Sequence, residues 1–137
     1  MKRLILIAVL IILAETIYAQ TFQKGNRFTH HVINVTLAPN VTMDQYLNFF
    51  RNEIIPVYEK NYQGVKVYLT EGIRGECGNC YGFITAYKSK TDWERYHNLD
   101  GSSTDLGKAS FEKMNHVIDE LGKFGVNKDR NTTWDIQ

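Results

Sequence analysis

Residues 28–62 read FTHHVINVTLAPNVTMDQYLNFFRNEIIPVYEKNY, and two apolar periods follow one another in this stretch. The first period is two residues, because apolar side chains and one histidine occupy alternate positions: His31, Ile33, Val35 and Leu37. This alternation predicts a strand over residues 28–38 with one apolar face. The intervening side chains then point to the opposite face: Val32, Asn34 and Thr36.

The second period is helical. Pro39 and Asn40 end the strand, and Thr42 is a predicted N-cap. Apolar residues then recur at helical spacing up to Tyr62: Met43, Tyr46, Leu47, Phe50, Ile54, Val57 and Tyr58. Pro56 is expected to kink this helix or to start its last turns, because proline has no backbone N–H to donate.

A hairpin is predicted after Gly64. Residues 65–70 alternate between two sets, with Val65, Val67 and Leu69 on one face and Lys66, Tyr68 and Thr70 on the other. A turn-rich stretch over residues 72–78 leads into a further strand over residues 81–87.

The remaining sequence predicts a broken helix and a last strand. TDWE at residues 91–94 matches a capping box, with Thr91 as N-cap and Glu94 reaching back. Poor helix formers at residues 100–103 should interrupt the helix, which restarts near Thr104. Its apolar stripe runs to Gly125, a predicted C′ glycine, through Leu106, Ser110, Met114, Val117, Leu121 and Phe124. Alternating Thr132, Trp134 and Ile136 predict a strand over residues 131–137.

The predicted order is therefore β-α-β-β-α-β, which is the ferredoxin-like α+β plan: an antiparallel four-stranded sheet with two helices on one face. Three stretches resemble the dimeric α/β-barrel superfamily, which includes stress-responsive barrel proteins and antibiotic-biosynthesis monooxygenases: HHVINVTL (30–37), NEIIPV (52–57) and WERY (93–96). The resemblance implies that residues 28–137 form one domain and that two copies pair through their sheets as a homodimer.

The sheet face without helices is the predicted binding surface, since a face rich in aromatic side chains is rarely left bare. On the third strand either Gly82, Ile84 and Ala86 or the aromatic set could occupy this face, and the aromatic set suits it better. The predicted ligand pocket then comprises His30, Asn34, Thr36, Tyr68, Tyr81, Phe83, Thr85, Tyr87 and Trp134. Such a pocket suits a small apolar or aromatic ligand, although the same residues could equally form a dimer interface.

A catalytic set is not evident in the sequence. The enzymatic alternative is a cofactor-independent monooxygenase or isomerase, in which His30, Asn34 and Tyr68 polarise the substrate. No cofactor is expected. A metal site is disfavoured, because the two cysteines supply two ligands where structural zinc needs four, and the histidines are far apart: His30, His31, His97 and His116.

Cys77 and Cys80 are the only cysteines and form a CxxC motif in the hairpin turn. In an oxidising compartment they are expected to form a disulfide. A structural clip is favoured over a thiol-disulfide redox site, because redox CxxC motifs usually begin a helix and this one precedes a strand.

The N-terminus resembles a cleavable signal peptide, residues 1–19. Lys2 and Arg3 precede an apolar run over residues 4–14, and Ala19 is a small residue at the cleavage site. A membrane anchor is disfavoured, because a spanning helix needs about 20 apolar residues. Secretion or periplasmic export is therefore predicted, with a flexible lead over residues 20–27.

Charge excludes one class of partner. Removing the signal leaves 118 residues, with 14 basic and 14 acidic side chains. A neutral chain has no general attraction for phosphate backbones, so nucleic-acid binding is not expected.

Overall fold

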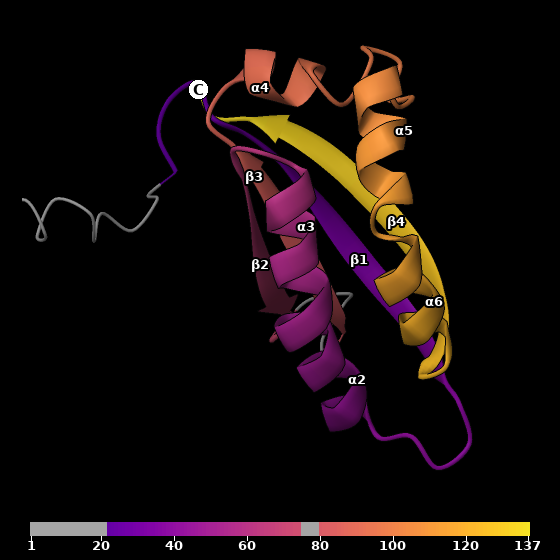
Figure 1. The fold of residues 1–137 in the computed structure, drawn as a ribbon. Coiled ribbons are helices and arrows are strands. Elements are labelled where there is room, and N and C mark those ends of the chain that lie inside the picture. Colours follow the sequence, from indigo (N-terminus) through magenta and orange to yellow (C-terminus); the bar gives the residue numbers. More distant parts are fainter. Residues whose placement is uncertain (1–21, 75–79) are drawn as a thin grey trace, which may run out of the picture.

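Four strands form one antiparallel sheet in the computed structural model, which describes residues 22–74 and 80–137 (Figure 1). The strands are β1 (Arg27–Leu37), β2 (Val65–Glu71), β3 (Tyr81–Tyr87) and β4 (Gly125–Asp135), in the spatial order β2-β3-β1-β4. Helical segments lie between β1 and β2 and between β3 and β4, so the predicted β-α-β-β-α-β order is confirmed. The α+β fold is compatible with the ferredoxin-like plan. The predicted signal peptide lies outside the described residues.

The first helical arm runs without a gap from residue 43 to residue 61. It consists of α2 (Met43–Phe49), the π-helical turn η1 (Phe50–Ile54) and α3 (Ile55–Asn61). Thr42 is the N-cap as predicted, and Gln45 completes a capping box with it. Pro56 lies in the first turn of α3, where a missing N–H costs little. The wider turn ahead of it, in which the Ile55 N–H donates to the Phe50 carbonyl, lets the helix continue.

The second arm is divided more finely than the sequence suggests, into α4 (Lys90–Glu94), α5 (Asp105–Glu112) and α6 (Asn115–Gly122). The predicted N-cap Thr91 is wrong by two residues. Ser89 caps α4, and its hydroxyl accepts from the Asp92 N–H at 3.1 Å. The predicted break over residues 100–103 and the restart at Thr104 are confirmed, with the Thr104 hydroxyl accepting from the Gly107 N–H.

Strand β4 begins six residues earlier than predicted, because residues 127–130 are polar and conceal the pattern. It pairs with β1 along its whole length, from Arg27 opposite Asp135 to Leu37 opposite Gly125. Gly125 is therefore a strand residue and not the C′ glycine of a helix. A Cβ at this position would lie 2.6 Å from the Thr36 carbonyl oxygen, so the close approach of β1 requires glycine.

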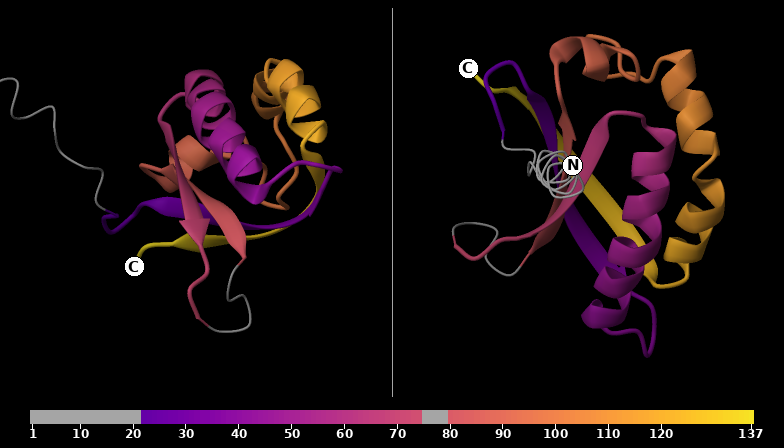
Figure 2. Two further views of the ribbon diagram at one scale, coloured as in Figure 1. Left: turned by 90° about the horizontal axis from the view of Figure 1, so that it is seen from below. Right: turned by 60° about the vertical axis from the view of Figure 1, so that its left-hand side comes forward.

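Both helical arms cover the same face of the sheet (Figure 2). The covered face carries the expected apolar side chains of β1 and β2, and Ile33, Val65 and Val67 are buried. The register places one set of β3 side chains opposite them: Tyr81, Phe83, Thr85 and Tyr87. The prediction that this set lies on the uncovered face is therefore wrong. These rings fill the space beneath the helices, and the Phe83 ring lies 5.2 Å from the Phe50 ring of η1.

The uncovered face is called the open face here. Its side chains come from alternate positions of all four strands: Phe28, His30, Val32, Asn34, Thr36, Lys66, Tyr68, Thr70, Gly82, Ile84, Ala86, Thr132 and Trp134. Trp134 is 55% exposed and Tyr68 is 38% exposed. The Phe22 ring packs beside the rings of Phe28 and Tyr68, at centroid distances of 5.5 and 6.2 Å. This face thus presents several aromatic side chains to its surroundings.

Within the described residues, the helices are too short or too polar to cross a membrane.

Candidate ligand-binding site

A cavity of about 300 Å³, here called the large compartment, lies between the covered face of the sheet and the two helical arms. Its walls are mainly apolar and aromatic. They come from β1, β2, β3 and both arms, and include Ile33, Phe50, Ile54, Tyr62, Val67, Phe83, Phe111, Met114, Ile118 and Leu121. The sheet forms its floor and the arms form its sides.

A second cavity of about 110 Å³, the small compartment, is more polar. It is lined by hydroxyl and amide side chains together with aromatic rings, including Thr29, Thr85, Tyr87, Trp93, Asn131 and Thr133. Three residues line both compartments, namely His31, Tyr58 and His97. The two compartments therefore adjoin, and we call them together the helix-side cavity.

The two central strands, β1 and β3, form the floor of this cavity. His31 on β1 is directly opposite Phe83 on β3, and the two rings stack at a centroid distance of 4.2 Å with an interplanar angle of 5°. Two residues before His31 on β1, Thr29 is buried, and its hydroxyl hydrogen-bonds the hydroxyl of Thr133 on β4 at 2.9 Å. The alternation of each strand thus brings an imidazole and several hydroxyl groups to the same side of the sheet.

His97 reaches the cavity from the turn that follows α4. The backbone N–H of His97 donates to the Trp93 carbonyl at 3.1 Å, and an isolated β-bridge pairs His97 with Ser103. Between them, Gly101 has a φ of 83°, and the Asp100 carboxylate accepts from the Ser102 N–H at 2.9 Å. The poor helix formers that end the helix therefore build a closed turn that fixes the position of the imidazole.

A hydrogen bond joins the two polar groups of the cavity wall. The Tyr87 hydroxyl and His97 Nε2 are 3.1 Å apart, and the His97 ring stacks on the Trp93 ring at 4.9 Å. Burial, together with the nearby His31 imidazole, lowers the pKa of His97. Burial also raises the pKa of Tyr87 to about 12. Both side chains are therefore neutral at physiological pH.

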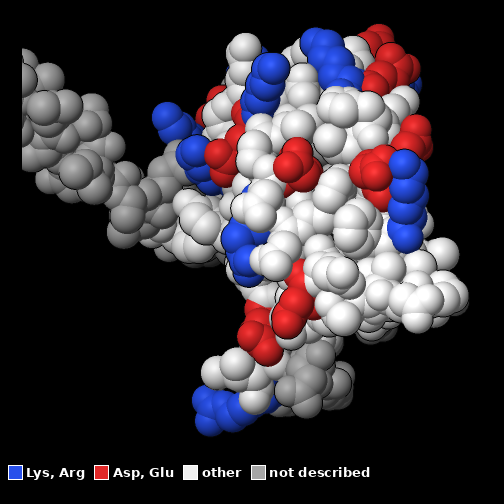
Figure 3. Space-filling model, turned by 60° about the horizontal axis from the view of Figure 1, so that its bottom comes forward, with Lys and Arg blue, Asp and Glu red and all other residues white. Residues whose placement is uncertain are grey.

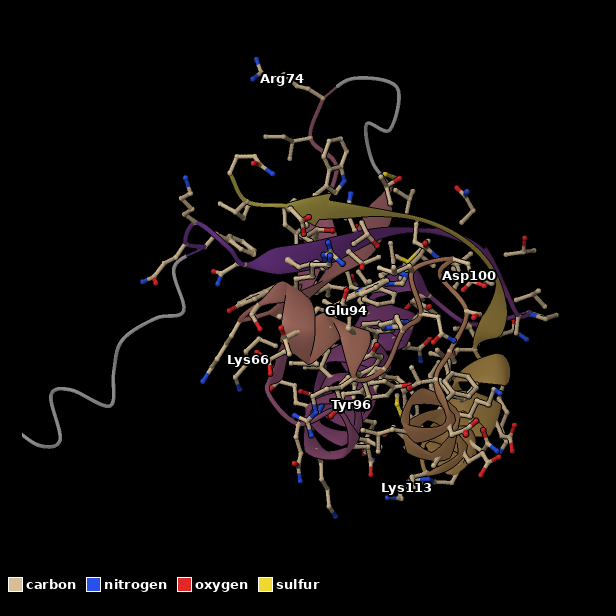
Figure 4. The ribbon with its side chains drawn as sticks, turned by 90° about the horizontal axis from the view of Figure 1, so that it is seen from above. Lys66, Arg74, Glu94, Tyr96, Asp100 and Lys113 are labelled. Atoms are coloured by element: carbon tan, nitrogen blue, oxygen red, sulfur yellow. The ribbon has the colours of Figure 1, made fainter. Side chains whose placement is uncertain are left out.

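Tyrosines connect the first helical arm to this turn. The rings of Tyr58 and Tyr62 stack at 4.4 Å, and the Tyr62 ring lies 4.9 Å from the Tyr96 ring. The Tyr62 hydroxyl donates to the Gly107 carbonyl at 3.2 Å, and burial raises its pKa to about 12. In Figure 4 the Tyr96 side chain lies among the helices, on the opposite side of the sheet from Arg74. The contacts of Tyr62 with Tyr96 and Gly107 hold the two arms at a set distance around the cavity.

The residues predicted to form one pocket are divided between the two faces of the sheet. Phe83, Thr85 and Tyr87 line the helix-side cavity, and Tyr81 packs beside the core on the same side. The other five predicted residues lie on the open face: His30, Asn34, Thr36, Tyr68 and Trp134. The proposed enzymatic set of His30, Asn34 and Tyr68 is among these five, so none of its members lines the helix-side cavity.

On the open face, His30 of β1 interacts with Thr70 of β2, across the strand β3 that lies between them. Its Nε2 is 3.4 Å from the Thr70 hydroxyl, and Gly82 lies between the two strands. A Cβ at residue 82 would lie 3.0 Å from Thr70 Oγ1, 3.2 Å from His30 Nε2 and 2.3 Å from the His31 carbonyl oxygen. Glycine therefore allows His30 and Thr70 to approach one another.

Charged side chains are absent from the described residues that line either compartment. In the described part of the chain, no three His, Cys, Asp or Glu side chains group as metal ligands would. On the face shown in Figure 3, basic and acidic side chains are interspersed. The cavity is thus suited to an uncharged guest.

Of the cysteine motif, the structure describes Cys80, which lines neither compartment. Cys77 is outside the described residues, so its pairing with Cys80 stays a prediction. Cys80 immediately precedes β3, and its carbonyl accepts from the Gly72 N–H at 2.8 Å. Arg74, the last described residue before the motif, lies on the side of the sheet away from the helices (Figure 4).

Sequence reasoning missed most residues of the site, among them His31, Tyr58, Trp93 and His97. One of them carried a usable signal, because His31 stands in register with Ile33, Val35 and Leu37 on an otherwise apolar face. A histidine at such a position faces the core and needs a partner there. The other three lie in separate elements, and only the fold brings them together.

No family model matches the chain, and no curated protein does. One similar solved structure is that of an ethyl tert-butyl ether D (EthD) family protein from Bacillus halodurans. It is 16% identical, and the alignment covers 75% of this chain and 96% of that one, with a TM-score of 0.38.

Proposed function

We propose that this chain is a small-molecule-binding protein that holds an apolar or aromatic ligand in the helix-side cavity. The observation that carries the proposal is the pairing of an apolar compartment of about 300 Å³ with an adjoining polar one of about 110 Å³. Ligand pockets in proteins are mostly apolar, have a few convergent polar groups, and begin at roughly 300 Å³. The cavity therefore suits a ligand with one or two aromatic rings.

Filling the large compartment tests this proposal. Ile118 lines it from α6, so Ile118→Trp should place an indole in the ligand's space. We expect the wild-type protein to bind diphenylmethane in isothermal titration calorimetry and the variant to lose this binding. The matched control is Lys113→Trp, because Lys113 is exposed on the outer side of the helices (Figure 4). Unchanged binding by a folded Ile118→Trp variant would show that the ligand site lies elsewhere.

We further propose that the open face pairs with the same face of a second copy. The support is its exposed aromatic surface, in which Trp134 is 55% exposed and Phe22 is 48% exposed. Trp134→Glu should convert a dimer into a monomer in analytical ultracentrifugation at micromolar concentration. Leu99→Glu, in the turn after α4, is the control, because Leu99 is 79% exposed but lies outside the open face. A wild-type protein that is monomeric at this concentration contradicts the dimer.

Export and the disulfide form one further proposal, because export would bring the chain into an oxidising compartment, where a disulfide persists. The mature protein should begin at Gln20 and contain a Cys77–Cys80 bond of structural type. Intact-mass measurement of protein recovered from outside the cytoplasm reports both the cleavage site and the loss of two hydrogens. A reduction potential within the cellular glutathione range would instead favour the redox alternative.

The second candidate function is proton-transfer catalysis, and the hydrogen bond between Tyr87 and His97 favours it. A neutral imidazole beside an apolar compartment is a suitable general base. The test is exchange of the α-protons of 1-tetralone in D₂O, followed by NMR, with His97→Gln as the comparison. Exchange that does not exceed the buffer rate would leave binding alone as the function.

A further inference from the structure

Trp93 carries a buried hydrogen-bond donor with no acceptor among the described residues. Its side chain is 6% exposed, and its indole Nε1 has no hydrogen-bond partner in the described part of the chain. The two faces of the ring are both covered. The Arg27 guanidinium carbon lies 4.7 Å from the ring centroid, and the His97 ring stacks at 4.9 Å.

An unpaired donor at such a position is costly, since burial removes its hydrogen bonds to water and none replaces them. More than about 90% of buried polar groups are satisfied in folded proteins. Phenylalanine would provide similar packing without this cost. The indole N–H therefore indicates a partner other than the described residues.

The environment of Trp93 specifies what this partner offers. Because the indole N–H only donates, the partner must supply an acceptor atom. Trp93 lines the small compartment, which is rich in hydroxyl and amide groups, whereas the adjoining large compartment is apolar. A ligand that spans both compartments thus has an apolar body and one polar end.

The charge of this ligand is constrained too. Arg27, beside Trp93, forms two hydrogen bonds with Asp135, at 2.5 and 2.7 Å, and is neutralised by it. Burial lowers the pKa of His97, so this imidazole is neutral. An anionic ligand would lose its hydration without gaining an opposite charge, which is unfavourable. The polar end should therefore be an uncharged oxygen.

We propose that the ligand is an uncharged aromatic ketone or a compound of similar chemistry, whose carbonyl oxygen accepts a hydrogen bond from Trp93 Nε1 while its rings occupy the large compartment. This inference rests on the proposed ligand-binding function and deepens it, by assigning the specificity-determining contact.

The experiment compares benzophenone with diphenylmethane, which have the same two rings and differ by a carbonyl in place of a methylene. Wild-type protein should bind benzophenone roughly two- to twelvefold more tightly, since one net hydrogen bond is worth about 0.5–1.5 kcal/mol. In ¹H–¹⁵N spectra the Trp93 indole proton should move downfield with benzophenone only. The chain has two tryptophans, so Trp134→Phe assigns the two indole signals.

Trp93→Phe should lower the affinity for benzophenone to that for diphenylmethane, and the affinity for diphenylmethane should stay the same. Equal affinities of the wild-type protein for the two probes, or an indole signal that does not respond to benzophenone, would overturn the inference while the binding function stands. An indole proton already downfield without ligand, and unchanged by benzophenone, would assign the donor to a buried water. Failure of both probes to bind would overturn the binding function together with the inference. The indole signal of the wild-type protein decides the matter even where Trp93→Phe does not fold.

Discussion

Gly107 provides a sharp test of how the second helical arm meets the turn that carries His97. It is the third residue of α5 and is buried. A Cβ added there would lie 2.2 Å from the Tyr96 carbonyl oxygen and 3.2 Å from the Tyr96 carbonyl carbon. Helix propensity alone favours alanine over glycine by about 1 kcal/mol. The structure predicts the opposite sign for Gly107→Ala.

The contacts around this site give the magnitude. The Tyr96 carbonyl also accepts from the Thr104 N–H at 3.0 Å, and the Gly107 carbonyl accepts from Tyr62 at 3.2 Å. Neither backbone group can move without weakening a hydrogen bond worth about 1 kcal/mol. Overpacking of this kind costs about 1–3 kcal/mol. After the gain in propensity, we expect Gly107→Ala to lower the free energy of unfolding by about 2 kcal/mol.

Urea unfolding followed by far-ultraviolet circular dichroism measures this difference. Gly122→Ala in α6 is the matched control, because a Cβ there has no atom within 4 Å in the described structure. That variant should be as stable as the wild type or more stable, by up to about 1 kcal/mol. If Gly107→Ala proved as stable as Gly122→Ala, the close packing of α5 on the His97 turn would be refuted.

Three further predictions concern the walls of the cavity. The pKa of His97 is lowered in the folded state, so the unfolded chain binds more protons than the folded one. The free energy of unfolding should therefore fall as the pH drops from about 7, through the ordinary value of 6.5, to the lowered pKa. His97→Gln should flatten this part of the pH profile in urea titrations. Tyr87→Phe removes the hydroxyl that bonds His97 and should cost about 1 kcal/mol in thermal melts, so an unchanged melting temperature would argue against that bond. Phe50→Ala should lower the free energy of unfolding by about 3–5 kcal/mol, because Phe50 is 4% exposed. Phe111→Ala, at a half-exposed position on the cavity wall, should lower it by less than about 1 kcal/mol. Similar losses in the two variants would contradict the burial of Phe50.

The site also has consequences for which chemistry this chain can perform. The enzymatic set drawn from sequence lies on the open face, where His30 approaches Thr70. The helix-side cavity instead offers His97, paired with Tyr87. Any acid–base reaction in that cavity would therefore depend on the turn after α4 and not on His30.

Local patterns in the sequence were sufficient for β1 and β2, for the Thr42 cap and for the order of elements. Alternation in β1 and β2 predicts both the strands and their buried faces, because the period of two is a property of each strand alone. Thr42 and Thr104 are recognisable as caps for the same reason: each bonds an N–H three residues away. These signals need no knowledge of distant parts of the chain.

The facing of β3 and the composition of the site were decided by tertiary structure. Both sides of β3 are largely apolar or aromatic, so the sequence of β3 does not show whether Phe83 or Ile84 faces the helices. The register of β3 against β1 and β2 decides this. The early start of β4 follows likewise from pairing with β1. His31, Trp93 and His97 share a cavity only because the sheet and both arms enclose it. A contact between residues far apart in sequence leaves no periodic trace, and hence only the folded chain defines this site.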